Sequence, residues 1–390
     1  MSQRRRMVAA VRRGRSMRSV AVRYGVPPSL VQYWVRRAQG LRLDRVTWTN
    51  RPVGCRNPSN RTAAAVEDRV LRIRKQLRDE SALGECGAEA IRRAMQRRQQ
   101  KQVPGVRTIG RILERRGALD GRRRLRRPPP PRGWYLPEVA AQRAELDSFD
   151  VIEDLVIAGG TDVNVLTGIS LHGGLCAAWP QSRITAKFTV QALVEHWRHW
   201  GRPAYAKFDN DTIFQGTHRY PDSLGRVIRL CLSLGVTPVF APPRETGFQA
   251  DIENFNGRWQ TGVWCRFQFT ALAGVQRQSA RYVAASRHKH AIRVHEAPRR
   301  RKFPNRWRLN LQAPLQGTVI FLRRTTPQGN VSLLGRSFPA SPDWCSRLVR
   351  AEVDLTRGEI RIYALRRREP TVHRHLSTHR YQPPTKKFTE

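Results

Sequence analysis

The acidic side chains of the middle third of this chain are the residues best suited to chemistry. They occur in three short segments: Glu145-Leu-Asp147, Asp209-Asn210-Asp211, and the Ile-Glu253-Asn-Phe-Asn256 segment. Carboxylate oxygens are the hard ligands that Mg²⁺ prefers, and a metal site needs several of them to converge from separate elements. The three segments therefore predict a divalent-metal site if the fold brings them together.

The charge of the rest of the chain indicates the partner. The 390 residues carry a net charge of +42, divided as +26 over residues 1–136, +2 over 137–290 and +14 over 291–390. Such an excess argues against an ordinary metabolic enzyme and favours nucleic acid as the partner. No apolar stretch suits a membrane, and the six cysteines are scattered without a CxxC pair, so we expect a cytoplasmic protein with reduced thiols.

The elements that must position these acids follow a recognisable order. Residues 145–150, 163–171 and 175–179 read as three strands, followed by a helix over 185–200 and a strand over 204–208. A helix over 224–234, a strand over 236–241 and a helix from Gly247 onward complete the series. This order predicts a ribonuclease-H-like α/β core over residues 138–290, with a mixed sheet covered by helices.

Two helical modules are expected before the core. Residues 1–40 show three short helices around a Gly25-Val-Pro27 turn, the helix-turn-helix pattern, which leaves four DNA-binding candidates on the last helix: Gln32, Tyr33, Arg36 and Arg37. Residues 61–120 form a second helical DNA-binding domain, in which Arg107 and Arg111 are expected to contact DNA. A purely structural bundle with a solvated basic face remains the alternative for each module.

A basic, proline-rich linker is expected over residues 121–137, with DNA-binding candidates Arg122, Arg123 and Arg124 followed by four prolines. After the core, short strands over 317–323, 330–335, 347–353 and 359–364 predict a small β-barrel domain over residues 309–370. Residues 371–390 complete the chain as a basic tail. The barrel is expected to bind DNA, with protein interaction as the alternative.

The quoted segments give the chain a family resemblance. Glu145-Leu-Asp147, Phe208-Asp-Asn-Asp-Thr-Ile-Phe214 and Gly247-Phe-Gln-Ala-Asp-Ile-Glu-Asn-Phe-Asn256 together resemble the catalytic core of the DDE transposases and retroviral-type integrases. With the helix-turn-helix before and an SH3-like barrel after, the resemblance covers most of the chain. It is closest to bacterial insertion-sequence transposases, because the N-terminal zinc module of retroviral integrases is missing.

The resemblance implies roles for individual residues. Asp147, Asp209 and Glu253 would be the catalytic acids and would hold two Mg²⁺ ions, for which Mn²⁺ can substitute. Asn256 and Gln260 lie on the same helical face as Glu253 and are candidates for contacting DNA beside the metals; Arg258 is a further DNA-binding candidate.

Two of these assignments have alternatives. Asp150 lies on the same strand as Asp147, which we prefer because Glu-Leu-Asp matches the family's first-strand motif better. Glu245 fits the shorter spacing from Asp209 that the family commonly shows. We prefer Glu253 because it lies in the helical segment, whereas Glu245 follows two prolines in a loop. An inserted loop after Phe214 accounts for the longer spacing.

The function implied is that of a DNA transposase. It would bind the terminal inverted repeats of its element, hydrolyse a phosphodiester at each 3′ end and join that end to target DNA by transesterification. Holding two ends of double-stranded DNA calls for a homo-oligomer, a dimer or a tetramer, associated with the nucleoid. The alternatives are a non-catalytic, sequence-specific DNA-binding protein derived from a transposase, and a metal-dependent nuclease without strand transfer.

Overall fold

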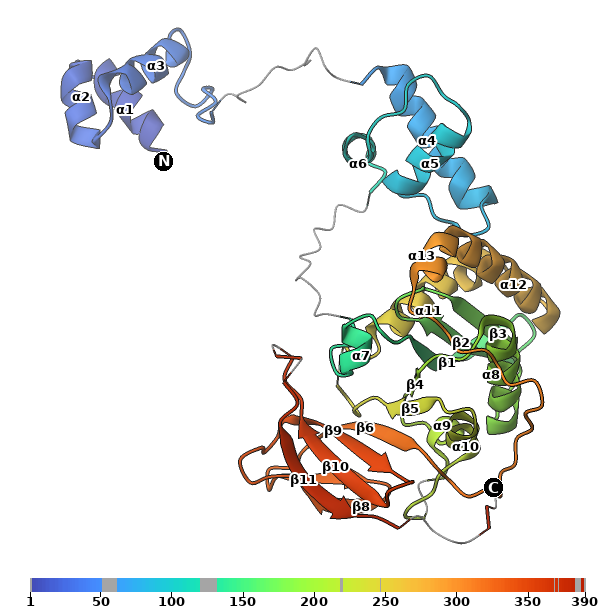
Figure 1. Ribbon diagram of the computed structural model, residues 1–390. Helices are drawn as coiled ribbons and strands as arrows, with labels where there is room; N and C mark the ends of the chain where they lie inside the picture. The colour runs from blue at the N-terminus through green and yellow to red at the C-terminus, as the bar shows by residue number, and fades with distance from the viewer. Residues whose placement is uncertain are drawn as a thin grey trace. The chain divides into compact units, whose positions relative to one another are not determined.

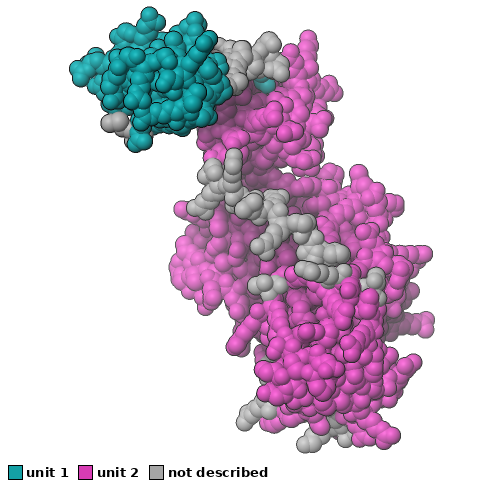
Figure 2. All heavy atoms as spheres, turned by 90° about the vertical axis from the view of Figure 1, so that its left-hand side faces the viewer, with its two compact units in different colours: residues 1–64 teal, residues 65–390 magenta. Residues whose placement is uncertain are grey.

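The computed structural model describes residues 2–50, 62–119, 132–217, 220–245, 247–367, 369–370, 372–382 and 387–388. The chain divides into two compact units, residues 1–64 and residues 65–390, which Figure 2 colours teal and magenta. The smaller unit is helical, and the larger one combines a helical bundle with a mixed sheet (Figure 1). Within the described residues, no helix has the length and apolar character needed to cross a membrane.

The smaller unit consists of three short helices: α1 (Gln3–Arg12), α2 (Met17–Tyr24) and α3 (Pro28–Ala38). The hydroxyls of Ser2 and Ser16 accept hydrogen bonds from the first turns of α1 and α2, where backbone N–H groups lack helical partners. Gly25 ends α2 with a φ of 62°, a left-handed conformation that glycine adopts without strain. The helices pack around Trp34, so the helical pattern predicted for residues 1–40 is confirmed.

A second helical bundle begins the larger unit: α4 (Ala64–Glu80), α5 (Ala88–Arg97) and α6 (Val106–Arg115). Ile73, Ile91 and Ile109 lie in its fully buried core. The buried carboxylate of Glu67 pairs with Arg115, which fastens the end of α6 to the start of α4. The three helices predicted for residues 61–120 are therefore present, and their DNA-binding role stays a prediction.

A sheet of nine strands organises the rest of the larger unit, in the order β11-β10-β9-β6-β5-β4-β1-β2-β3 (Figure 1). Its first five strands in the chain are β1 (Leu146–Ile157), β2 (Thr161–Ser170), β3 (Cys176–Gln181), β4 (Tyr205–Phe208) and β5 (Thr237–Phe240). β1, β2 and β3 form an antiparallel meander, while β4 lies parallel to β1 and β5 parallel to β4. The mixed sheet predicted for the middle third is confirmed.

Helices cover both faces of this sheet. One face packs against α8 (Ala186–Trp200), α9 (Thr212–Gln215) and α10 (Arg226–Ser233), and the other against α11 (Ala250–Gly262) and α12 (Leu272–Lys289). Three shorter helices complete the set: α7 (Pro137–Ala140), η1 (Trp264–Arg266) and α13 (Ala291–Glu296). Successive side chains of a strand point to opposite faces, so on β1 Phe149 packs with Trp197 of α8 whereas Ile152 packs with Ile252 of α11.

The end of the expected linker belongs to the core. Residues 120–131, which include Arg122, Arg123 and Arg124, lie outside the described part of the chain. Trp134, Tyr135 and Leu136 are buried against Leu146 of β1 and Val239 of β5. The boundary predicted at residue 137 was too late. Three consecutive large apolar side chains would expose a large apolar area to water in a linker, so they are buried in the core instead.

The C-terminal strands continue the core's sheet, and this corrects the expected separate barrel. They are β6 (Thr318–Arg324), β7 (Asn330–Leu333), β8 (Arg336–Pro339), β9 (Leu348–Asp354), β10 (Glu359–Ala364) and β11 (His375–Arg380). β6 pairs in parallel with β5 through Val239–Ile320 and Phe240–Phe321, and β7 and β8 form a second, two-stranded sheet. Four consecutive residues of β6 are buried, as in a strand covered on both faces. β11 also occupies part of the expected basic tail.

Candidate active site

Two aspartates, Asp150 and Asp209, follow the stretch in which β1 and β4 pair in parallel. The register joins Leu146 to Tyr205 and Ser148 to Lys207. Continued by two residues beyond this pairing, the same register would place Asp150 level with Asp209, the residue that follows the last residue of β4. Neighbours in a parallel register point to the same face of a sheet, so both carboxylates project to the face that carries α11.

Burial and neighbouring negative charges act on both aspartates. The pKa of Asp150 is raised to about 6, first by burial and then by the negative charges of Asp209 and Glu253. Burial also raises the pKa of Asp209, and the charges of Asp211 and Glu153 add to it. Glu153 was missed by the sequence analysis, because a bulge between Ile152 and Leu155 interrupts the alternation of β1.

Helix α11 is fixed to β1 and β2 by the side-chain hydrogen bonds of Asn256. The amide nitrogen Nδ2 of Asn256 donates to Oδ2 of Asp150 at 2.8 Å, and its Oδ1 accepts from Oγ1 of Thr167 on β2 at 2.8 Å. Glu253, which is exposed, lies three residues before Asn256 and hence on the same helical face. The Asn256 amide, expected to contact DNA, is instead used to hold Asp150 and α11.

The start of α11 is held by a buried lysine. Lys207 of β4 is 1% exposed, and its Nζ donates to the Tyr135 hydroxyl at 2.9 Å and to the Phe248 carbonyl, two residues before α11 begins. The ammonium group also lies 5.5 Å from the centre of the Tyr135 ring. Burying an ammonium is costly unless its protons find acceptors, so these contacts are a strong constraint on where α11 begins.

Asp147 does not join this cluster, contrary to the sequence-based preference. It is 1% exposed, and Arg300 donates to it through both terminal nitrogens, one at 2.8 Å. Nε1 of Trp197 donates to its Oδ2 at 3.1 Å. Asp147 is three residues from Asp150 and so points to the opposite face, toward α8. The alternation of β1 was a signal that could have separated the two aspartates.

The remaining acids and amides near the strand ends have structural partners. Glu245, the alternative third acid, forms an ion pair with Arg324 at the end of β6. Asn210 donates from Nδ2 to the carbonyl of Ala241 at 2.7 Å and accepts from Nη2 of Arg323 at 2.7 Å. The side-chain amide of Asn210 therefore joins the end of β4 to the end of β5 and to β6. These bonds fix the backbone next to Asp209.

The donor set at this point suits a hard divalent cation. Asp150, Asp209 and Glu253 offer only carboxylate oxygens, and the pKa of Asp150 is raised first by burial and then by the charges of the other two acids, both of which a bound cation would offset. Across the described ranges, no three Asp, Glu, His or Cys side chains are already close enough to form a metal site. The Glu253 side chain is exposed, so it is the ligand that would have to move toward the two aspartates.

The candidate DNA-binding side chains differ in their exposure and in the contacts that they already make within the protein. Gln32, Tyr33 and Arg36 are exposed on α3 and line a hollow with Ser29. Arg37 lines the same hollow, but its guanidinium lies over the Trp34 ring and donates to the carbonyl of Thr49 at 2.9 Å.

In the larger unit, three candidates are exposed: Arg107 and Arg111 on α6, and Arg258 on α11. Gln260 is half-buried on α11. Exposure leaves the three arginines able to meet a phosphate, and no contact in the described part of the chain requires them at these positions apart from a bond from Arg258 to its own helix.

Comparisons with known proteins give weak likenesses. No family model and no curated protein matches the chain. A simian T-cell lymphotropic virus intasome, solved in complex with PP2A regulatory subunit B56 gamma, aligns at 15% identity over 77% of this chain and 96% of that chain, with a TM-score of 0.35.

Two integrase catalytic core domains align over less of the chain. The BIV core gives 14% identity over 36% of this chain and 81% of that chain, with a TM-score of 0.27. The HTLV-2 core, solved in complex with magnesium in a dimeric form, gives 13% identity over 34% of this chain and 81% of that chain, with a TM-score of 0.26. TM-scores of this size do not establish a common fold.

Proposed function

We propose that the chain is a DDE-type DNA transposase in which Asp150, Asp209 and Glu253 hold Mg²⁺ or Mn²⁺ at a DNA phosphodiester. The observation that supports the proposal is the electrostatic interaction of Asp150 on β1 with Asp209, which follows β4, and with Glu253 on α11. Asp150 replaces Asp147 as the first acid because Asp147 is already bound by Arg300. The net charge of +42 supports DNA as the substrate.

The chain's own residues act by positioning. Divalent ions bound at these carboxylates would polarise the scissile phosphate and activate water, or a 3′-hydroxyl, as the nucleophile. Asn256 orients the carboxylate of Asp150, and Asn210 fixes the backbone that carries Asp209. Lys207 fixes the start of the helix that carries Glu253. No side chain has to form a covalent intermediate.

The proposal extends to recognition of the element ends. The order of β1 to β5 supports a ribonuclease-H-like core, and α2, the Gly25 turn and α3 support a helix-turn-helix with α3 in the major groove. Gln32, Tyr33 and Arg36 would then reach base edges and phosphates of the terminal repeats. Two ends held together require a dimer or a tetramer.

The test is a cleavage and strand-transfer assay on labelled element-end DNA with Mg²⁺. The wild type is compared with Asp150→Asn, Asp209→Asn and Glu253→Gln, and with Glu195→Gln as a control, because Glu195 is an exposed acid on α8. We expect the wild type and the control to cleave and join the ends, and the other three variants to bind DNA without doing either.

Other outcomes would replace parts of the proposal. An active Glu253→Gln beside an inactive Glu245→Gln would make Glu245 the third acid. A wild type that binds the ends specifically but never cleaves them with Mg²⁺ or Mn²⁺ would be a non-catalytic DNA-binding protein. Cleavage without joining would identify a nuclease.

A further inference from the structure

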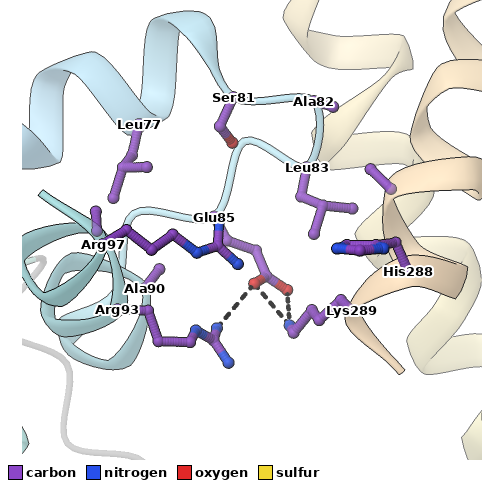
Figure 3. A pocket seen from close by; sticks show the side chains of 12 residues that line it. Leu77, Ser81, Ala82, Leu83, Glu85, Ala90, Arg93, Arg97, His288 and Lys289 are labelled. Atoms are coloured by element: carbon purple, nitrogen blue, oxygen red, sulfur yellow. Dashed lines mark hydrogen bonds and ion pairs between the residues drawn. The ribbon is translucent and has the colours of Figure 1, made fainter. Parts of the chain in front are cut away.

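A hollow of about 380 Å³ lies between the helical bundle (α4 to α6) and α12 (Figure 3). Helix α12 belongs to the part of the larger unit that carries the candidate active site, which we call the catalytic part (α7 to β11). Its floor is apolar and is formed mainly by Leu77, Leu83, Ala90, Ala94 and Ala285. Its basic side chains come from two helices: Arg93 and Arg97 from α5, and His288 and Lys289 from α12. Figure 3 shows the two pairs facing each other across the opening, with Glu85 between them.

The charge of the hollow is positive. Glu85 is the single acid among the described residues that line it. Its carboxylate binds Nζ of Lys289 through both oxygens, at 2.5 and 2.6 Å, and lies 3.7 Å from Nη2 of Arg93. One carboxylate therefore faces three permanent cations, those of Arg93, Arg97 and Lys289, so the hollow keeps a net affinity for anions.

The two walls are held together by contacts of the end of α4 and of the loop between α4 and α5. Nη2 of Arg266, at the end of η1, donates to the carbonyl of Asp79 at 2.8 Å, and its Nη1 donates to the carbonyl of Ser81. Leu83 packs against the apolar cluster formed with α11 and α12. The loop between α4 and α5 is therefore anchored on the catalytic part, and the basic groups on α5 and α12 form one preorganised site.

We propose that this hollow binds the sugar–phosphate backbone of duplex DNA. Phosphate oxygens would meet Arg93, Arg97 and Lys289, while deoxyribose would lie against the apolar floor, a pairing of chemistries that the backbone of DNA offers at every nucleotide. The inference rests on the proposed function and adds to it a DNA contact shared by the helical bundle and the catalytic part. DNA bound there lies across both, so the contact ties end recognition to the chemistry.

The experiment measures the affinity of the full-length protein for a 30-base-pair duplex of random sequence at several salt concentrations. Arg93→Gln/Arg97→Gln is compared with Arg72→Gln/Arg92→Gln, which removes the same charge from exposed positions on α4 and α5 outside the hollow. Removing one contact between a cationic side chain and a DNA phosphate lowers the slope of log K against log salt by about 0.9. We expect a fall of about 1.8 for the first variant, no change for the control, and unchanged thermal unfolding of both.

Three results would overturn the inference. Equal slopes for the two variants would mean that the hollow is no different from the surrounding basic surface. Weaker binding of poly-glutamate with unchanged DNA binding would assign the hollow to acidic polypeptides. A lower unfolding midpoint for Arg93→Gln/Arg97→Gln alone would mean that the two arginines stabilise the bundle. Failure of the wild type to bind any duplex would instead refute the proposed function itself.

Discussion

Asp147→Asn and Asp150→Asn remove the same charge three residues apart on β1, and we expect them to change stability in opposite directions. Asp147 is buried with Arg300, whose side chain is 12% exposed, and with the indole N–H of Trp197. The asparagine would leave the guanidinium buried without its counter-charge. Removing one partner of a buried ion pair costs about 3–5 kcal/mol of the free energy of unfolding.

The magnitude for Asp150 follows from its pKa. The pKa rises from 3.8 to about 6 in the folded chain, so without metal the ionised carboxylate lowers the free energy of unfolding by about 3 kcal/mol at pH 7.5. Because the folded-state pKa is the higher one, the group's favourable contribution is complete below pH 4 and is lost as the pH rises through 6. Asp150→Asn should therefore stabilise the protein by up to about 3 kcal/mol at pH 7.5 and by about half of that at pH 5.

The assay is urea unfolding followed by tryptophan fluorescence, in EDTA, at pH 5 and pH 7.5. Glu195→Gln serves as the control, because this exposed acid should change the free energy of unfolding by less than about 0.5 kcal/mol. If both variants lose stability equally, the reasoning from the raised pKa of Asp150 is wrong. If Asp147→Asn is the one that gains stability, then Asp147 and not Asp150 faces the other acids. The assignment of the first acid would then return to Asp147.

The other predictions concern metal, positioning and DNA. Millimolar Mg²⁺ should raise the unfolding midpoint of the wild type but not of Asp150→Asn; equal shifts would mean that the ion binds elsewhere. Lys207→Met should slow cleavage by at least about tenfold, as removal of the bonds at the start of α11 shifts Glu253, while Tyr135→Phe, measured alongside, should change the rate much less. Arg36→Ala should weaken binding of element ends and lower the salt slope by about 0.9, with unfolding unchanged. Arg37→Ala should lower the free energy of unfolding by about 1 kcal/mol, measured by the same unfolding experiment as for Arg36→Ala. Alanine cannot interact with the Trp34 ring or the Thr49 carbonyl as the guanidinium does.

Much of the secondary structure was available from local signals. Ser16 before α2, Gly25 after it and the period of the apolar side chains predicted the N-terminal helices, because caps and periodicity act within one or two turns of the chain. The strands and helices of the middle third followed from the same kind of pattern. The acidic segments that begin at Asp209 and that contain Glu253 also stood out, since few acids occur in so basic a chain.

Pairings between distant segments were decided by the tertiary structure alone. Asp150 rather than Asp147 faces Asp209 because β1 pairs with β4 in one register, and neither strand's sequence states that register. β6 was predicted as a strand, but its partner was not. β6 pairs with β5, where the ring of Phe321 stacks on that of Phe240, 81 positions earlier in the sequence. Local propensity determines what an element is, whereas its neighbour is chosen by the apolar surface and the hydrogen bonds that only the assembled sheet can satisfy.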